Sequence, residues 1–417
     1  MTRTALCALV IAALAAGASL ALAGSVTPSE ATLEKLRQSG DVAGQRRHVW
    51  EQLAAITAPR ANRPAFQAWH GEGELFSDAP SGRPGLAGFS RTGILDTQSP
   101  DVPMLTYTLY NDAAYNHITR NHLNQAATLE RLRKTASANP AISKNRDVPA
   151  FPAQSVVLKT VWWPVARDGL TALPVWDPAR NPAGKKGNPY TSWKRVVAVD
   201  PRAMPNQSAA VAIDFAGSNY PKARRVGLSA FDHVSVDGAM ARAMMADPSS
   251  RKAALIALGR PLAAGDHLVL VAANVAAREI PDWIWSAFWW HDQPEQGPYA
   301  ADRPASVTGP WRNYLMQAAF DAQKPLAAGK TPHITFNPWL EGRFPDGGHG
   351  GGIVSNCMAC HHRASYPAVP FLPVTRGKPD LRGDAAYASD QLRTSFLWGL
   401  AMHARPKSIT NTKPDSR

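Results

Sequence analysis

The chain has 417 residues, of which 45% are hydrophobic and 18% charged, and its formal net charge is +13. This composition argues against disorder, and the length allows two or three domains, or one large domain with an appendage. A basic excess favours acidic partners or an anionic surface. The basic residues are scattered, with the densest runs at Arg46-Arg47, Lys185-Lys186 and Arg224-Arg225. We therefore expect solvated basic faces and no nucleic-acid binding.

Residues 1–23 have the pattern of a secretory signal peptide. An apolar stretch from Ala5 follows Arg3 and ends in the small-residue triplet Ala21-Leu22-Ala23. Cleavage before Gly24 removes Arg3, which lowers the charge from +13 to +12. It predicts a periplasmic or secreted protein without a stable membrane span. The alternative is a retained anchor, because the uncleaved stretch could nearly span a membrane.

Residues 24–145 predict a helical and loop-rich N-terminal region. Thr27-Pro28-Ser29-Glu30 has the form of a capping box with Pro at the first helical position. Asn139-Pro140 marks the end of the last helical pattern. Helices are expected from this box to about Gln38, over Gln45–Ile56 and over Ile118–Ala138.

Residues 146–325 change to short apolar or alternating runs broken by Pro, Gly and Asp, which predict a β-rich central domain. A helical insertion is expected between Gly238 and Leu258. The runs that predict strands are 155–163, 193–199, 209–215 and 267–275.

Four of the 13 tryptophans fall within eight residues of the segment Glu279–His291. Large rings of this kind usually pack in a core or at a domain seam, which is the interpretation that we favour. The alternative is a ligand platform, with Trp283, Trp285 and Trp289 lining a substrate pocket.

The sequence Cys357-Met358-Ala359-Cys360-His361 is the attachment signature of a c-type haem. Two sulfurs one turn apart can bond both porphyrin vinyl groups, and the adjacent histidine then binds iron on the proximal side. Residues 326–405 are therefore expected to form the haem segment, with one covalent haem c, and 406–417 a disordered tail.

Three other chemistries use paired cysteines. A dithiol enzyme normally carries its motif at a strand-to-helix junction, whereas a glycine run, Gly347–Gly352, precedes Cys357 here. A zinc site needs two more ligands, and Cys7 would leave with the signal peptide. An ordinary disulfide does not account for His361. We therefore favour haem.

The distal side of the iron is open to several interpretations. Met402, in a helix expected over Ala385–His403, is the first choice for a sixth ligand. His333, His349 and His403 are alternatives, and so is a vacant position that would permit catalysis. His362 follows the proximal ligand directly and cannot reach the other face of the ring.

Two further groups could bind metal or act as acid and base. They are His70 with Glu72 and Glu74, and Asp232 with His233. Polar groups satisfied by hydrogen bonds are the favoured interpretation of both.

Four segments are distinctive: Trp69–Glu72, Glu279–Trp290, Thr335–Trp339 and Ser355–Ala364. They resemble segments of large, single-haem "cytochrome c family" proteins that bacteria export. The resemblance covers most of the mature chain and implies haem binding and electron transfer; only Cys357, Cys360 and His361 match a functional motif. The chain departs from small cytochromes c, because no amphipathic helix leads into the motif and little chain follows it.

The sequence as a whole predicts an α+β protein: a β-rich central domain with a helical N-terminal part and a C-terminal, cytochrome c-like haem segment. The expected function is that of an exported c-type cytochrome that passes electrons to a redox partner protein, itself acidic if it complements the basic charge. The alternatives are a haem-dependent oxidoreductase whose central domain binds substrate, and an envelope-binding module with an accessory haem.

Overall fold

The computed structural model describes residues 28–77, 103–138, 146–178, 180–181, 187–204, 209–321, 335–343, 356–368 and 391–405. The expected signal peptide, the glycine run before Cys357, the C-terminal tail, His333 and His349 lie outside the described residues.

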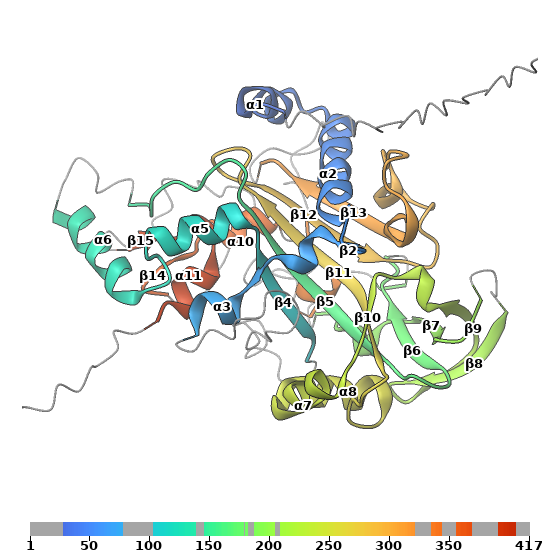
Figure 1. Ribbon diagram of the computed structural model, residues 1–417. Helices are drawn as coiled ribbons and strands as arrows, with labels where there is room; N and C mark the ends of the chain where they lie inside the picture. Colours follow the sequence, from blue (N-terminus) through green and yellow to red (C-terminus); the bar gives the residue numbers. More distant parts are fainter. Residues whose placement is uncertain are drawn as a thin grey trace, which may run out of the picture.

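Two N-terminal helices, α1 (Glu30–Ser39) and α2 (Val42–Thr57), confirm the two helices expected there. The predicted capping box is wrong by two residues, since Ser29 is the N-cap and its Oγ accepts from the Thr32 N–H at 3.2 Å. Gly40 ends α1 with φ +70°, a conformation that favours glycine. Helix α2 then packs its buried face, including Trp50, on strand β13 (Figure 1).

A seven-stranded antiparallel sheet forms the centre of the protein, in the order β13-β12-β11-β5-β4-β3, with β10 paired to one end of β11. The strands expected over 155–163 and 267–275 are confirmed as β5 and β11. The tryptophan-rich segment forms β12, which is buried throughout. The bounds are β3 His70–Gly71, β4 Leu105–Tyr110, β5 Val156–Val165, β10 His233–Ser235, β11 His267–Ala277, β12 Ile284–Trp290 and β13 Tyr314–Ala319.

A smaller sheet, ordered β6-β7-β9-β8, lies beside the main one (Figure 1). Its strands β7 and β8 confirm those expected over 193–199 and 209–215. The expected helical insertion is two helices, because Asp247 caps a new helix that has Pro248 at its first position. The bounds are β6 Thr171–Val175, β7 Arg195–Asp200, β8 Ala210–Phe215, β9 Ser218–Gly227, α7 Gly238–Ala246 and α8 Pro248–Leu258.

The helix expected over Ile118–Ala138 is divided into α5 (Asp112–Arg120) and α6 (Ala126–Ala138). His122, with φ +53°, lies in the turn between them. Asn111 fixes the start of α5: its Oδ1 accepts from the Ala114 N–H and from the Val156 N–H of β5, both at 3.0 Å. This amide therefore attaches the N-terminal helices to the central sheet.

The remaining elements are short. The helix expected over Ala385–His403 is confirmed only at its end, as α11: strand β15 comes first in the described part, and Ser395 and Phe396 have positive φ, which interrupts a right-handed helix before α11. The bounds are β1 Pro59–Arg60, β2 Arg63–Pro64, α3 Glu72–Phe76, α9 Pro338–Glu341, α10 Cys357–His361, β14 Ser365–Tyr366, β15 Leu392–Arg393 and α11 Trp398–His403.

Buried side chains form two clusters. The larger joins both sheets with α2, α7, α8 and α9. The smaller joins one end of the main sheet with α3, α5, α6, α10 and α11, which gather there in Figure 1. Strands β3 and β4, from the expected N-terminal region, belong to the main sheet, so that sheet crosses the boundary expected at 145/146. The protein is α+β.

An ion pair between the buried Asp266 and the partly exposed Arg260 holds the loop before β11. Asp266 accepts two bonds of 2.7 Å from Arg260 and further bonds from the backbone N–H groups of Ala263 and Arg167. Burial alone would raise the pKa of Asp266, but these donors outweigh it and lower the pKa. Its contribution to stability is therefore complete above about pH 4, the unfolded value, and is lost as the pH falls through the lower folded pKa.

We expect Asp266→Asn to lower the free energy of unfolding at pH 7 by roughly 1.5–3 kcal/mol, because a buried charged acceptor is lost. The difference from the wild type should shrink towards pH 3. Urea unfolding across this range measures both effects. Asp168→Asn, which alters a carboxylate that is 59% exposed, is the control and should change stability by less than about 0.5 kcal/mol. Equal effects of the two variants would contradict the prediction.

Candidate haem-attachment site

The Cys-x-x-Cys-His sequence forms its own short helix, α10, against strand β12 of the main sheet. Asn356 is the N-cap, and its Oδ1 accepts from the Met358 N–H at 2.8 Å. The N–H and the Sγ of Cys357 both donate to the carbonyl oxygen of Thr335, at 3.0 and 3.2 Å. Thr335 in turn donates to Ala318 O of β13. The first cysteine is thereby fixed to the central sheet.

Both thiols are free in the structure, Cys357 buried and Cys360 half-buried. Burial, assisted by the nearby carboxyl group of Glu341, raises the pKa of Cys357 and raises that of Cys360 to about 12. A reactive dithiol has the opposite feature, a lowered pKa that supplies thiolate. The pair does not have the electrostatics of a dithiol oxidoreductase.

The imidazole of His361 is oriented by the backbone. Its Nδ1 lies 2.9 Å from the carbonyl oxygen of Phe396, an acceptor that requires the proton on Nδ1 and leaves the Nε2 lone pair available. Burial lowers the pKa of His361 to about 4, so the ring is neutral at pH 7. The indole of Trp285 lies against it, with ring centroids 4.2 Å apart.

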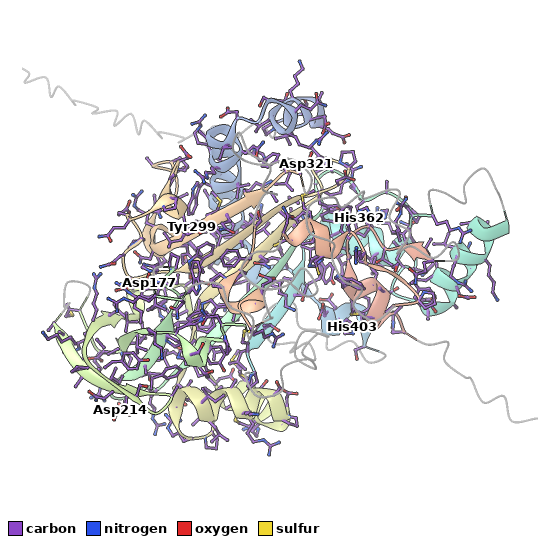
Figure 2. All side chains as sticks on the ribbon, turned by 180° about the vertical axis from the view of Figure 1, so that it is seen from behind. Asp177, Asp214, Tyr299, Asp321, His362 and His403 are labelled. Carbon is purple, nitrogen blue, oxygen red and sulfur yellow. The ribbon has the colours of Figure 1, made fainter. Side chains whose placement is uncertain are left out.

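Candidates for the distal ligand lie on α11. Met402 and His403 are half-buried, and the ring of His403 lies 5.9 Å from that of Phe76 on α3. Figure 2 shows His362 and His403 at the same end of the molecule, away from Asp214 of the small sheet. Met402 therefore belongs to the segment that carries the motif, and its role as sixth ligand stays a prediction.

A row of polar residues crosses the main sheet beside this site, and the sequence analysis missed it. Thr108, Lys159 and Asn274 are direct cross-strand neighbours on β4, β5 and β11. Apart from the first residues of β5 and β11, they alone are not buried in these three strands. The sequence did contain a signal for two members of the row, because Lys159 interrupts the apolar run Val156–Val161 and Asn274 interrupts the run Leu268–Val275. We call these three residues the polar row.

Glu341 of α9 lies above the polar row. Its carboxylate accepts from the Asn337 N–H and from Asn274 Nδ2, the latter at 3.4 Å. Desolvation raises the pKa of Glu341 to about 7, although the hydrogen bonds and the positive charge of Lys159 oppose the shift. A buried carboxyl, an amide and an ammonium group thus lie close to the cysteines.

The group predicted around His70 is only partly brought together. His70 Nδ1 lies 2.8 Å from Glu74 and its Nε2 3.1 Å from Asp112, and the ring stacks on Tyr115 at 3.7 Å. Glu72 instead approaches Gly399 of α11. The imidazole is satisfied by two carboxylates, as the favoured interpretation predicts.

Asp232 and His233 do not share a site. The carboxylate of Asp232 accepts from Gln67 at 3.0 Å, whereas the exposed His233 ring faces His267 with centroids 6.2 Å apart. Burial raises the pKa of Asp232 to about 7. Between about pH 4 and about pH 7 the carboxyl group of Asp232 is therefore protonated in the native protein but ionised in the unfolded chain. The free energy of unfolding consequently falls as the pH rises through this range.

We expect Asp232→Asn to remove this loss, since a neutral amide needs no deprotonation. Above pH 7 the variant should have the larger free energy of unfolding, and below pH 4 the two proteins should be similar. Chemical unfolding at several pH values measures this. The control is Asp214→Asn, at an exposed position of β8, which should keep the wild-type pH dependence of the free energy of unfolding. If Asp232→Asn also keeps this pH dependence, Asp232 is not the group that causes it.

The three tryptophans considered as a pocket are divided between the two buried clusters. Trp283 and Trp285 belong to the smaller buried cluster and Trp289 to the larger, and all three are at most 3% exposed. The favoured interpretation, core packing, is confirmed, and the alternative of a substrate pocket stays untested. Trp285 has a second role that the sequence did not indicate, its contact with His361.

Comparison with protein-family models, with curated proteins and with solved structures gives no match for this chain. Within the described ranges, no three His, Cys, Asp or Glu side chains are grouped so as to hold a metal ion, and no helix has the length and apolarity to cross a membrane. The resemblance to exported single-haem cytochromes therefore stays a prediction.

Proposed function

We propose that this protein is an exported c-type cytochrome that binds one covalent haem and transfers electrons to a redox partner protein. One observation carries the proposal: two free thiols one helical turn apart are followed by an imidazole whose Nδ1 is held by the Phe396 carbonyl. This combination is what thioether attachment and proximal iron ligation through Nε2 require.

The surroundings of α10 fit a haem in two further respects. The indole Nε1 of Trp285, beside His361, is buried without a hydrogen-bond partner, which is costly unless a bound group supplies an acceptor. His361, Lys159 and Asn274 are half-buried, so each keeps some surface that a bound group could contact.

The roles of the chain's own residues follow from this geometry. Cys357 and Cys360 would hold the haem covalently, and His361 would bind its iron, whose reversible one-electron change is the chemistry that the group supplies. Phe396 orients the imidazole, and Trp285 shields it from water. The net charge, +13 for the full chain and +12 after the expected cleavage removes Arg3, would attract an acidic partner by long-range electrostatics.

Absorption spectra of the protein, oxidised and reduced, test the proposal after export from cells with a working haem-attachment system. We expect a c-type spectrum, and a porphyrin adduct on the peptide that contains Cys357 and Cys360 by mass spectrometry. A low-spin spectrum favours an electron carrier, whereas a high-spin spectrum favours the oxidoreductase alternative with an open iron position. Colourless protein without an adduct would refute haem binding.

A further inference from the structure

The polar row lies next to the sheet residues that pack under the haem motif. Cross-strand neighbours lie on the same face of a sheet, so the row occupies one line across that face. The adjacent line, two residues further along each strand, belongs to the same buried cluster as Cys357. Its members are Tyr110, Val157, Ala276, Trp285 and Ala319.

Lys159 is therefore close to Trp285, both across the strands of the sheet and along them. It lies two strands from Trp285, roughly 10 Å at normal strand spacing, and one line away, roughly 7 Å. A lysine side chain and the width of a porphyrin can together cover this separation. The charge of Lys159 also acts on both His361 and Glu341.

The neighbours of Lys159 on the sheet do not hydrogen-bond its ammonium group. Asn274 is occupied, because its Oδ1 accepts from Asn337 Nδ2 at 2.8 Å and its Nδ2 donates to Glu341. Across the described part of the chain, Lys159 makes neither a hydrogen bond nor an ion pair within 4.0 Å. The Lys159 side chain is half-buried, so an anion bound beside it would meet an ammonium group that is only partly solvated.

We infer that Lys159 is the counter-ion of a propionate carboxylate of the haem, with the Thr108 hydroxyl and the Asn274 amide beside it. This rests on the proposed function, because the carboxylate belongs to the haem. A buried haem carries two carboxylates that also need compensation, so the lone ammonium and the propionate have complementary charges. Lys159 is a positioning residue that touches neither the iron nor its ligands.

The midpoint potential of the haem tests this inference. A positive charge near iron disfavours the ferric state, so its removal in Lys159→Met should lower the potential while covalent haem content stays at the wild-type level. Lys159→Arg keeps the charge and should stay near the wild-type potential. Lys222→Met, at an exposed position of β9, is the matched control and should leave the potential unchanged.

Each result has a distinct meaning. A wild-type chain without haem would refute the proposed function itself. A haem-bearing Lys159→Met with the same potential as Lys222→Met would overturn the Lys159 assignment alone. A changed spin state in both Lys159→Met and Lys159→Arg would also overturn it, because lysine would then be an iron ligand. If Lys159→Met does not fold, Lys159→Gln carries the same comparison.

Discussion

Alanine at both Cys357 and Cys360 is expected to abolish covalent haem attachment completely. The expected cleavage after residue 23 would leave these two thiols alone in the chain, and each would form one thioether in the proposed attachment, so the double variant would have no sulfur to bond a vinyl group. Single variants should keep one thioether and a shifted spectrum. Haem staining after denaturing electrophoresis, together with the mass of the purified chain, measures attachment directly.

The motif provides a matched control at its second position. Met358 is buried in the same cluster, and Met358→Leu conserves its volume without touching either sulfur. This variant should keep covalent haem at the wild-type level. Covalent haem in the double cysteine variant, or its loss in Met358→Leu, would contradict attachment through these two thiols.

Removal of the Trp285 side chain is expected to have the largest effect on stability. The side chain is 3% exposed and packs against His361 and Phe396. Trp285→Ala should lower the free energy of unfolding by roughly 3–5 kcal/mol, because it leaves a cavity under α10. Trp285→Phe keeps a ring at this position and should cost less. Guanidinium unfolding measures both variants.

Trp289 distinguishes a general packing effect from one at the haem. It lies on the same strand and the same face as Trp285 but packs in the other buried cluster, against Trp176 and Phe336. Trp289→Ala should destabilise the protein comparably. We expect only the Trp285 variants to shift the haem absorption bands as well. Equal spectra in the Trp285 and Trp289 variants would show that Trp285 does not contact the proximal histidine.

Secondary structure was predictable where a local pattern was strong and continuous. The apolar runs of β5 and β11 and the alternating burial of β8 correspond to the expected strands. The break between α5 and α6 was not predictable, because His122 adopts its left-handed conformation in a turn whose backbone bonds to Thr119 and Ile118 replace helical ones. The C-terminal helix was overestimated for a similar reason: Ser395 and Phe396 have positive φ, and both accept hydrogen bonds from distant parts of the chain, from Trp283 for Ser395 and from His361 for Phe396.

The sequence by itself determined which chemistry is proposed for the motif, because thioether attachment would depend on the local spacing of Cys357, Cys360 and His361. Only the tertiary structure decided which groups surround that motif. The Phe396 carbonyl, the Trp285 ring and the Lys159 ammonium come from three separate parts of the chain. Side-chain periodicity indicates which face of a strand is buried, but strand order and register decide which residues meet on that face.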